Sequence, residues 1–392
     1  MRFFFTLLFT YSGPIWESCL LDCFFHKSKG GIIIKAKPFF NGLLVWVVTL
    51  SLLTGCSSQI ATTDQNNTAG GQSQTNGDTE QGGETSGTAV KTGLSVVASA
   101  AQSTQATQAS DGLAQSGITM VAVTVDDAGV IDRCVIDEIR CDIRFDAQGT
   151  LVTPSDTQFP SKNELGRNYG MHTASSIDKD WSEQAAAFAA YVEGKTVEEV
   201  ETMAITEDGK VSDADLAASV TLYVGSFVDG IKNAVGNAQH LGAQKDNTLK
   251  LVSSADMASS ASATGQEDGT AQADAIIAAV TMEGDTFTSC LLDAVQPKVT
   301  FDSSGKITGD LTAPTPTKNQ LGRDYGMHKA SSIDKDWGEQ ATAFASYVTG
   351  KTLEQVAGIA VDEYQKPTQA DLTASVTLSI GEFQSLLAKA GT

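Results

Sequence analysis

The chain contains one stretch of sequence twice, and this duplication constrains the fold more than any other feature. "LGRNYGMHTASSIDKDW" at Leu165–Trp181 recurs as "LGRDYGMHKASSIDKDW" at Leu321–Trp337. From Cys134 onward, corresponding residues are separated by a constant 156 positions. Self-similarity at a fixed spacing is the signature of repeated structural units. The sequence therefore predicts two copies of one module, at residues 118–240 and 275–392.

Each copy combines a β pattern with a helical pattern. Residues 118–152 alternate between apolar and polar side chains, with turn signals at Asp127–Gly129 and Asp146–Gly149, which predicts two or three antiparallel strands. Residues 178–194 have helical spacing, with a capping box formed by Asp180 and Glu183. We expect Gly194 to end this helix.

The rest of each copy predicts three further elements. A second capping box, Thr196 with Glu199, begins a short helix. "ASVTLYV" at residues 218–224 is β-branched and predicts a returning strand. Residues 225–238 predict a closing helix. The expected class is α+β, a small antiparallel sheet covered by helices.

The N-terminal region reads as a targeting segment. Residues 38–55 are apolar and follow Lys35 and Lys37, and they end in "LLTGC" at Leu52–Cys56. This resembles the lipobox of bacterial lipoproteins, in which the signal is removed before a cysteine that carries lipid. The resemblance implies a signal region at 1–55, lipidation of Cys56, and attachment to the extracytoplasmic face of the cell membrane. Residues 1–34 fit a signal poorly, which suggests a true start near Ile32–Lys35.

Two segments are rich in small and polar residues. Residues 56–117 contain mostly Ser, Thr, Gln, Gly, Asn and Ala, which is typical of a flexible tether. Residues 241–274 contain a second such run, Ser253–Asp274. The sequence predicts a tether after Cys56 and a linker between the modules.

Charge and cysteine content limit the function. The chain has 47 acidic and 26 basic residues, so nucleic-acid binding is not expected. None of the six cysteines forms a C-x-x-C pair, which argues against a zinc ribbon or a thioredoxin-type site. Cys134 and Cys141 are expected on opposite faces of one strand. With Cys290, they are interpreted as small buried hydrophobic residues.

The two copies have diverged unevenly. Of 32 aligned positions from Leu165 to Thr196, 26 are identical in the second copy, but only 8 of 31 from Cys134 to Glu164 are. A second island of identity is "ADLAASVTL" (Ala214–Leu222) against "ADLTASVTL" (Ala370–Leu378). Islands of this kind indicate either demanding packing or a ligand site.

Both interpretations of the islands stay open at this point. Gly166 and Gly170 are expected at positive φ, and caps and glycine turns restrict residue choice. Arg167, Tyr169, His172 and Lys179 exceed what folding requires, which favours a ligand. No H-x-x-x-H, catalytic triad or G-x-G-x-x-G loop occurs, so neither a metal site nor an enzyme is favoured.

The second island resembles a known motif. "DLAASVT" (Asp215–Thr221) and "DLTASVT" (Asp371–Thr377) look like degenerate forms of the D-x-x-S-G-A-T motif of the FMN-binding domain family. The Asp and the final Thr match the motif. In this chain Ala, Ser and Val stand where the motif has Ser, Gly and Ala, respectively. The combination of a lipobox, a tether and two tandem modules also resembles Gram-positive lipoproteins of extracellular electron transfer, some of which are pheromone precursors.

The resemblance implies a cofactor and a set of site residues. FMN would be esterified by a flavin transferase, with its phosphate on the threonine, and the protein would pass electrons to a redox partner. Arg and His would offset the phosphate charge and Tyr would stack on the ring. The residues concerned are Thr221, Thr377, Asp215, Asp371, Arg167, Arg323, Tyr169, Tyr325, His172 and His328. The alternative function is a non-catalytic surface module that recognises wall polymer or a protein.

Overall fold

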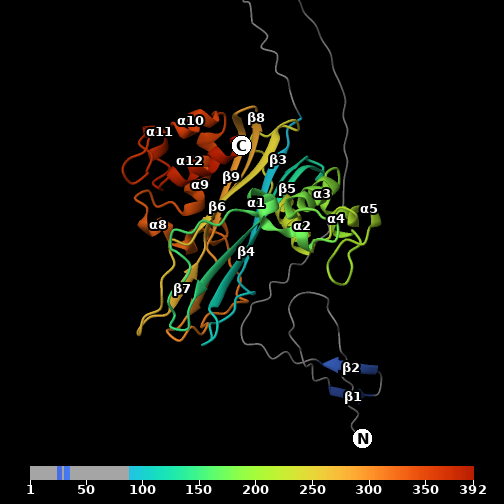
Figure 1. Cartoon of the computed structure of the whole chain (residues 1–392). Helices are drawn as coiled ribbons and strands as arrows, with labels where there is room; N and C mark the ends of the chain where they lie inside the picture. The colour runs from blue at the N-terminus through green and yellow to red at the C-terminus, as the bar shows by residue number, and fades with distance from the viewer. Residues whose placement is uncertain (1–23, 29–30, 36–87) are drawn as a thin grey trace, which may run out of the picture. The chain divides into compact units, whose positions relative to one another are not determined.

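The computed structural model describes residues 24–28, 31–35 and 88–392 (Figure 1). The first two segments are strands β1 (Phe24–Ser28) and β2 (Gly31–Lys35), which pair antiparallel in a unit separate from the rest. The predicted signal core at 38–55, Cys56 and the tether up to residue 87 lie outside the described residues. Among the residues that the structure describes, no helix is long and apolar enough to cross a membrane.

Residues 88–240, called the first half below, begin with an antiparallel sheet in the order β3-β4-β5. Its strands are β3 (Lys91–Ser99), β4 (Gly112–Val125) and β5 (Ile131–Phe145). The predicted hairpin is confirmed, with Gly129 at φ 83° in its turn. The predicted tether is wrong over residues 88–117, because β3 and part of β4 lie there. Small residues obscured the apolar pattern of β3, whose Leu94 and Val96 are buried.

Residues 241–392, the second half, form a matching sheet in the order β6-β8-β9. Its strands are β6 (Thr248–Asp256), β8 (Asp274–Glu283) and β9 (Thr286–Val295), and beside it β7 (Gly269–Gln272) pairs with β10 (Lys298–Phe301). The predicted linker at 241–274 is therefore wrong where β6 and β7 lie. Both halves begin with a strand that a serine- and alanine-rich composition concealed.

Helices follow the strands in the same order in both halves. In the first half they are α1 (Lys162–Leu165), η1 (Gly166–Tyr169), α2 (Met171–Ala174), α3 (Trp181–Val192), α4 (Val197–Glu201), α5 (Ala214–Ala217) and α6 (Gly225–Gly236). In the second they are α7 (Lys318–Leu321), η2 (Gly322–Tyr325), α8 (Met327–Ala330), α9 (Trp337–Val348), α10 (Leu353–Ala357), α11 (Ala370–Thr373), α12 (Gly381–Ala388) and η3 (Lys389–Gly391).

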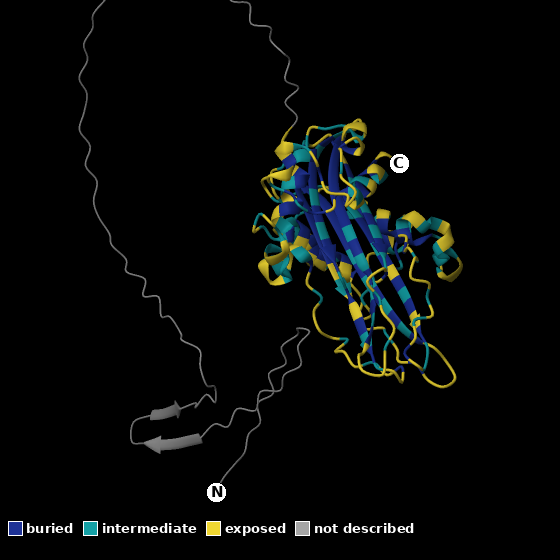
Figure 2. Cartoon of the chain, turned by 90° about the vertical axis from the view of Figure 1, so that its left-hand side faces the viewer, coloured by how far each residue is buried: buried dark blue, intermediate teal, exposed yellow. Residues whose placement is uncertain are grey.

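The two sheets share one hydrophobic core. Ile118, Met120 and Ile139 from the first sheet pack in a cluster with Ile277 and Ala279 from the second. The other face of each sheet packs against the helices of its own half, so the strands lie between two groups of helices (Figure 1). Figure 2 shows the strands largely buried, with exposed residues on the helices and loops.

Phe145 and Phe301, which occupy corresponding positions in the two halves, stack on each other in the shared core. Their ring centroids are 4.0 Å apart with an interplanar angle of 4°, and both side chains are fully buried. The neighbouring loops exchange backbone hydrogen bonds, from Ala106 N–H to Gly305 C=O and from Ala263 N–H to Gly149 C=O. The halves therefore bury a common surface in one folded unit.

The α+β prediction is confirmed, and so are the capping boxes at Asp180 and Thr196. The returning strand predicted at residues 218–224 is wrong. Ala214–Ala217 is a short helix, and a loop follows that buries Val220 and Leu222 in the core under the helices. Alternating burial fits this loop as well as a strand, and β3 supplies the third strand instead.

Cys134, Cys141 and Cys290 are free and buried, as interpreted from the sequence. Cys134 lies in the core under the first-half helices and Cys141 in the core between the sheets, so the two face opposite sides of β5. Burial raises the pKa of Cys141 and of Cys290 to about 12. These thiols are therefore protonated and unreactive at neutral pH.

Candidate functional site

The repeated stretch forms a tight loop that depends on unusual backbone angles. Gly166 and Gly170 have φ of 49° and 81°, which confirms the prediction made for them, and Asp178 also has a positive φ of 50°. Gly322, Gly326 and Asp334 repeat these angles in the second half. A side chain at the glycine positions would be strained, which explains part of the sequence identity.

In the first half, the side chains predicted to contact a ligand instead contact other residues of the protein. The Asp180 carboxylate, whose side chain is only 6% exposed, lies 2.9 Å from His172 Nδ1 and 3.7 Å from Arg167 Nη1. Lys179 Nζ donates to Ser219 Oγ at 3.1 Å, which joins the two islands. Arg167, His172 and Lys179 therefore have structural partners.

In the second half, the same residues are arranged differently. Arg323 Nη2 pairs with Asp334 Oδ1 at 2.9 Å rather than with Asp336, which caps its own helix as Asp180 does. His328 Nδ1 is buried and has no hydrogen-bond partner among the described residues. The loop backbone is conserved between the halves, but the ion pairs that hold it are not.

A buried glutamine connects the two islands in each half. Gln340 is fully buried; its Nε2 donates to the Lys335 carbonyl at 3.0 Å and to Ser331 Oγ at 3.3 Å. Its Oε1 accepts from the backbone N–H of Thr377 at 2.8 Å and from the Thr377 hydroxyl at 3.0 Å. Gln184 makes the same four bonds, ending on Thr221. This network uses the whole hydrogen-bonding capacity of the amide.

The threonines do not fit covalent attachment of FMN. The hydroxyls of Thr221 and Thr377 donate to buried amide oxygens, so a phosphoester would break that network. Asp215 and Asp371 are exposed on α5 and α11, and within residues 88–392 neither forms a hydrogen bond or ion pair with the tyrosines or histidines. The structure therefore brings each threonine next to the first island but leaves each aspartate outside.

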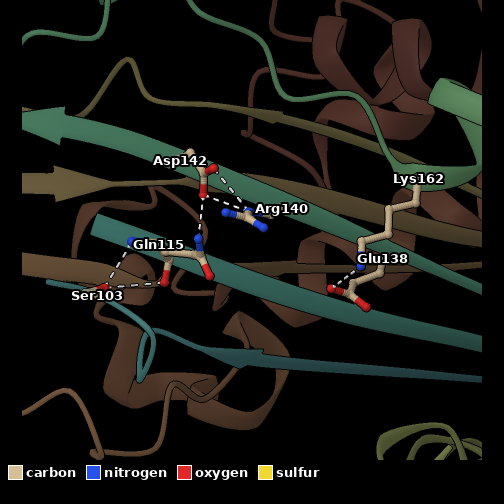
Figure 3. Close-up of polar contacts among 6 residues, drawn as sticks. All are labelled: Ser103, Gln115, Glu138, Arg140, Asp142 and Lys162. Carbon is tan, nitrogen blue, oxygen red and sulfur yellow. Dashed lines mark hydrogen bonds and ion pairs between the residues drawn. The ribbon is translucent and has the colours of Figure 1, made fainter. Parts of the chain in front are cut away.

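Sequence reasoning missed a polar cluster on the outer face of the first sheet. Lys162, only 7% exposed, lies 2.7 Å from Glu138 and over the rings of Tyr169 and Trp181 at 4.8 and 5.0 Å. Figure 3 shows this pair beside a second one, in which Arg140 Nε contacts the Asp142 carboxylate at 3.0 Å. The two cations and two carboxylates neutralise each other.

The second half has different residues at the same positions. Lys318 lies over the rings of Tyr325 and Trp337, at 4.8 and 5.4 Å, as Lys162 does over Tyr169 and Trp181. Ala294, Gln296 and Lys298 stand where the first half has Glu138, Arg140 and Asp142. A groove of about 400 Å³ opens here, lined by Tyr325, Leu321, Lys318, Lys298 and Gln296 among others.

A second, more polar groove of about 750 Å³ lies between the second sheet and α12. It shares Lys318 and Gln296 with the Tyr325 groove. Asp256 and Asp274, cross-strand partners on β6 and β8, line it. Among the residues from 88 onward, no group of three His, Cys, Asp or Glu side chains is placed to hold a metal ion.

Asp137, which is buried, and its counterpart Asp293, which is partly buried, are carboxylates that the sequence did not single out. Burial raises the pKa of Asp137 to about 6, although the N–H groups of Asn163 and Glu138 donate to it at 3.0 and 2.7 Å. Burial also raises the pKa of Asp293. The sequence signal that could have revealed them is that both halves have aspartate at this position, although the surrounding strands otherwise differ. Each aspartate stabilises the start of the short helix before the repeated loop.

This burial predicts a pH-dependent stability. The pKa of Asp137 is higher in the folded chain than the ordinary 3.8. The stability that its protonated carboxyl adds to the folded state is therefore fully present below about pH 4 and is lost as the pH rises through about 6. Asp137→Asn removes this dependence. From pH 7.5 down to 4, the unfolding free energy of the wild type should rise relative to the variant by about 2–3 kcal/mol. Urea unfolding at several pH values measures it, and a constant difference would contradict the assignment.

Comparison with protein-family models, with curated proteins and with solved structures finds no match to this chain. The geometry of the described residues is therefore the basis for any functional assignment.

Proposed function

We propose that this chain is a cell-surface lipoprotein, anchored through Cys56, whose folded unit binds a small ligand without catalysing a reaction. The observation that carries the proposal is the groove of about 400 Å³ beside Tyr325, the aromatic residue of the repeated loop. Sites for small molecules usually have volumes of roughly 300–1,000 Å³ and combine apolar walls with a few polar groups. Leu311, Pro314, Pro316 and Leu321 supply apolar walls here.

The two halves support the proposal unequally. Tyr325 lines the groove, whereas Tyr169 lies beside the Arg140–Asp142 pair, where the Asp142 carboxylate and then Tyr169 raise the pKa of Arg140. The larger, more polar groove lacks an aromatic wall. We therefore place the ligand at Tyr325 and assign the corresponding surface of the first half a structural role.

FMN is the first ligand to test, bound non-covalently. Its flat ring would lie against Tyr325, and its phosphate would lie near the lysines. When bound, FMN would supply redox chemistry, and electron transfer at the cell surface would be the resulting activity. Thr377 is not part of this site, because its hydroxyl donates to Gln340.

Titration of the purified chain with FMN, followed by quenching of flavin fluorescence, tests the proposal. Tyr325→Ala should weaken binding by about three- to tenfold, the range expected for loss of one stacking partner. Tyr169→Ala is the matched control and should leave the affinity unchanged.

Two outcomes of this titration would contradict the proposal. Equal losses in the two tyrosine variants would remove the assignment to the second half. Absence of flavin binding, together with capture of the chain on peptidoglycan that depends on Tyr169 and Tyr325, would instead support the alternative of a wall-recognition module.

A further inference from the structure

Two lysines of the second half share one groove and have no carboxylate partner. Lys318 and Lys298 both line the Tyr325 groove, and within residues 88–392 neither lies within 4.0 Å of an acidic side chain. In the first half, Lys162 lies 2.7 Å from Glu138, and Asp142 occupies the position equivalent to Lys298. The ion pair that holds Lys162 is absent in the second half, where Lys318 acts on a carboxylate only from beyond 4.0 Å: burial raises the pKa of Asp293, and Lys318 opposes that rise.

This difference arises from three positions that changed between the halves. Glu138 corresponds to Ala294, Arg140 to Gln296 and Asp142 to Lys298. The first-half set of two cations and two anions, drawn in Figure 3, becomes a set of two cations in the second half. Two lysines without an ion pair in one groove are unexpected in a chain with 47 acidic and 26 basic residues.

The surroundings of Lys318 favour an anion. The Lys318 residue is half-buried and its ammonium lies over two aromatic rings, where a charge interacts more strongly than in bulk water. Thr300 also lines the groove, and its hydroxyl, which accepts from the Thr308 hydroxyl at 3.1 Å, can still donate its own proton; the Gln272 amide donates instead to the Asp274 carboxylate at 2.8 Å. The one carboxylate in the lining, Asp310, is exposed and accepts from the Thr312 N–H and hydroxyl at 2.9 and 2.7 Å.

We propose that Lys318 and Lys298 bind the anionic group, a phosphate or a carboxylate, of a small ligand whose apolar part lies against Leu321 and the prolines of the groove. This inference rests on the proposed function and specifies its ligand class. The first half does not bind such a ligand, because its two cations, Lys162 and Arg140, already form ion pairs with Glu138 and Asp142. Charge-assisted hydrogen bonds to the two lysines provide the selectivity for an anion.

The test uses three probes that share a ring: phenyl phosphate, benzoate and benzyl alcohol. Their binding to the purified full chain is measured by NMR titration at low salt. Phenyl phosphate or benzoate should bind at least about tenfold more tightly than benzyl alcohol. Comparison of the first two probes distinguishes a phosphate ligand from a carboxylate ligand.

Three variants assign the effect to the groove. Lys318→Met keeps the packing on the rings and should reduce binding of the anionic probe to that of benzyl alcohol. Lys298→Asp, at an exposed position, restores the carboxylate that the first half has at Asp142 and should also weaken binding of the anionic probe, with Lys318 retained. Lys162→Met is the matched control and should change the affinity less than twofold. Thermal unfolding and circular dichroism verify that each variant is folded.

The outcomes separate this inference from the proposed function. Equal binding of all three probes at the groove would overturn the anion site and leave small-ligand binding supported. Equal losses in Lys318→Met and Lys162→Met would overturn the assignment to the second half. No binding of any probe, together with no binding of FMN or riboflavin, would overturn both.

Discussion

Phe301→Ala should lower the free energy of unfolding of the chain by about 3–5 kcal/mol, the range for truncating a fully buried phenylalanine. Phe301 is fully buried and stacks on Phe145 between the two sheets, so alanine leaves a cavity where the halves meet. Urea unfolding monitored by tryptophan fluorescence measures the loss.

A shared core has two further expected consequences. Phe145→Ala should cost a similar amount, and the double variant should cost less than the sum, because the two rings contact each other. Tyr364→Ala, at a side chain that is 67% exposed, should change the free energy by less than about 0.5 kcal/mol. A loss below 1 kcal/mol for Phe301→Ala, or two separate unfolding transitions in the wild type, would contradict a common core.

Gln340→Leu should lower the free energy of unfolding by roughly 3 kcal/mol or more, because leucine leaves several buried polar groups without partners. These include the backbone N–H of Thr377 and the carbonyl of Lys335, which both bond to the glutamine amide. The same urea experiment measures the loss, and Gln184→Leu should reproduce it in the first half.

A matched control separates the buried network from the change in residue type. Gln266 is exposed, and its side chain makes no hydrogen bond within residues 88–392, so Gln266→Leu should change the free energy of unfolding little. A cost below 1 kcal/mol for Gln340→Leu would mean that the two islands owe their identity to something other than this network.

The helices α3, α4 and α6 were predictable from local patterns, whereas the short helices α1, α2 and α5 and the strands β3, β6 and β7 were not. The capping residues Asp180 and Thr196 marked helix starts because side-chain caps act over three residues. β3 and β6 were interpreted as tether and linker, since serine, alanine and threonine give little apolar contrast. Their burial depends on a partner sheet far away in the sequence, which local patterns do not reveal.

The sequence identified the repeated loop as unusual but did not explain it. Uneven divergence pointed to Arg167, His172 and Thr221, and the structure shows that their contacts are largely internal. Gln184 was overlooked, because a glutamine in a helix carries no signal of burial. The groove at Tyr325 was not predictable either, since it depends on Gln296 and Lys298, which lie in a segment that matches poorly between the halves.

The most direct test of small-ligand binding beside Tyr325 is an NMR titration of the chain labelled with ¹³C at its tyrosines. Tyr325→Phe and Tyr169→Phe assign the two resonances of interest. Addition of FMN should shift the Tyr325 ring resonance, leave that of Tyr169 unchanged, and saturate at one equivalent. Shifts of both rings, of Tyr169 alone or of neither would contradict the account.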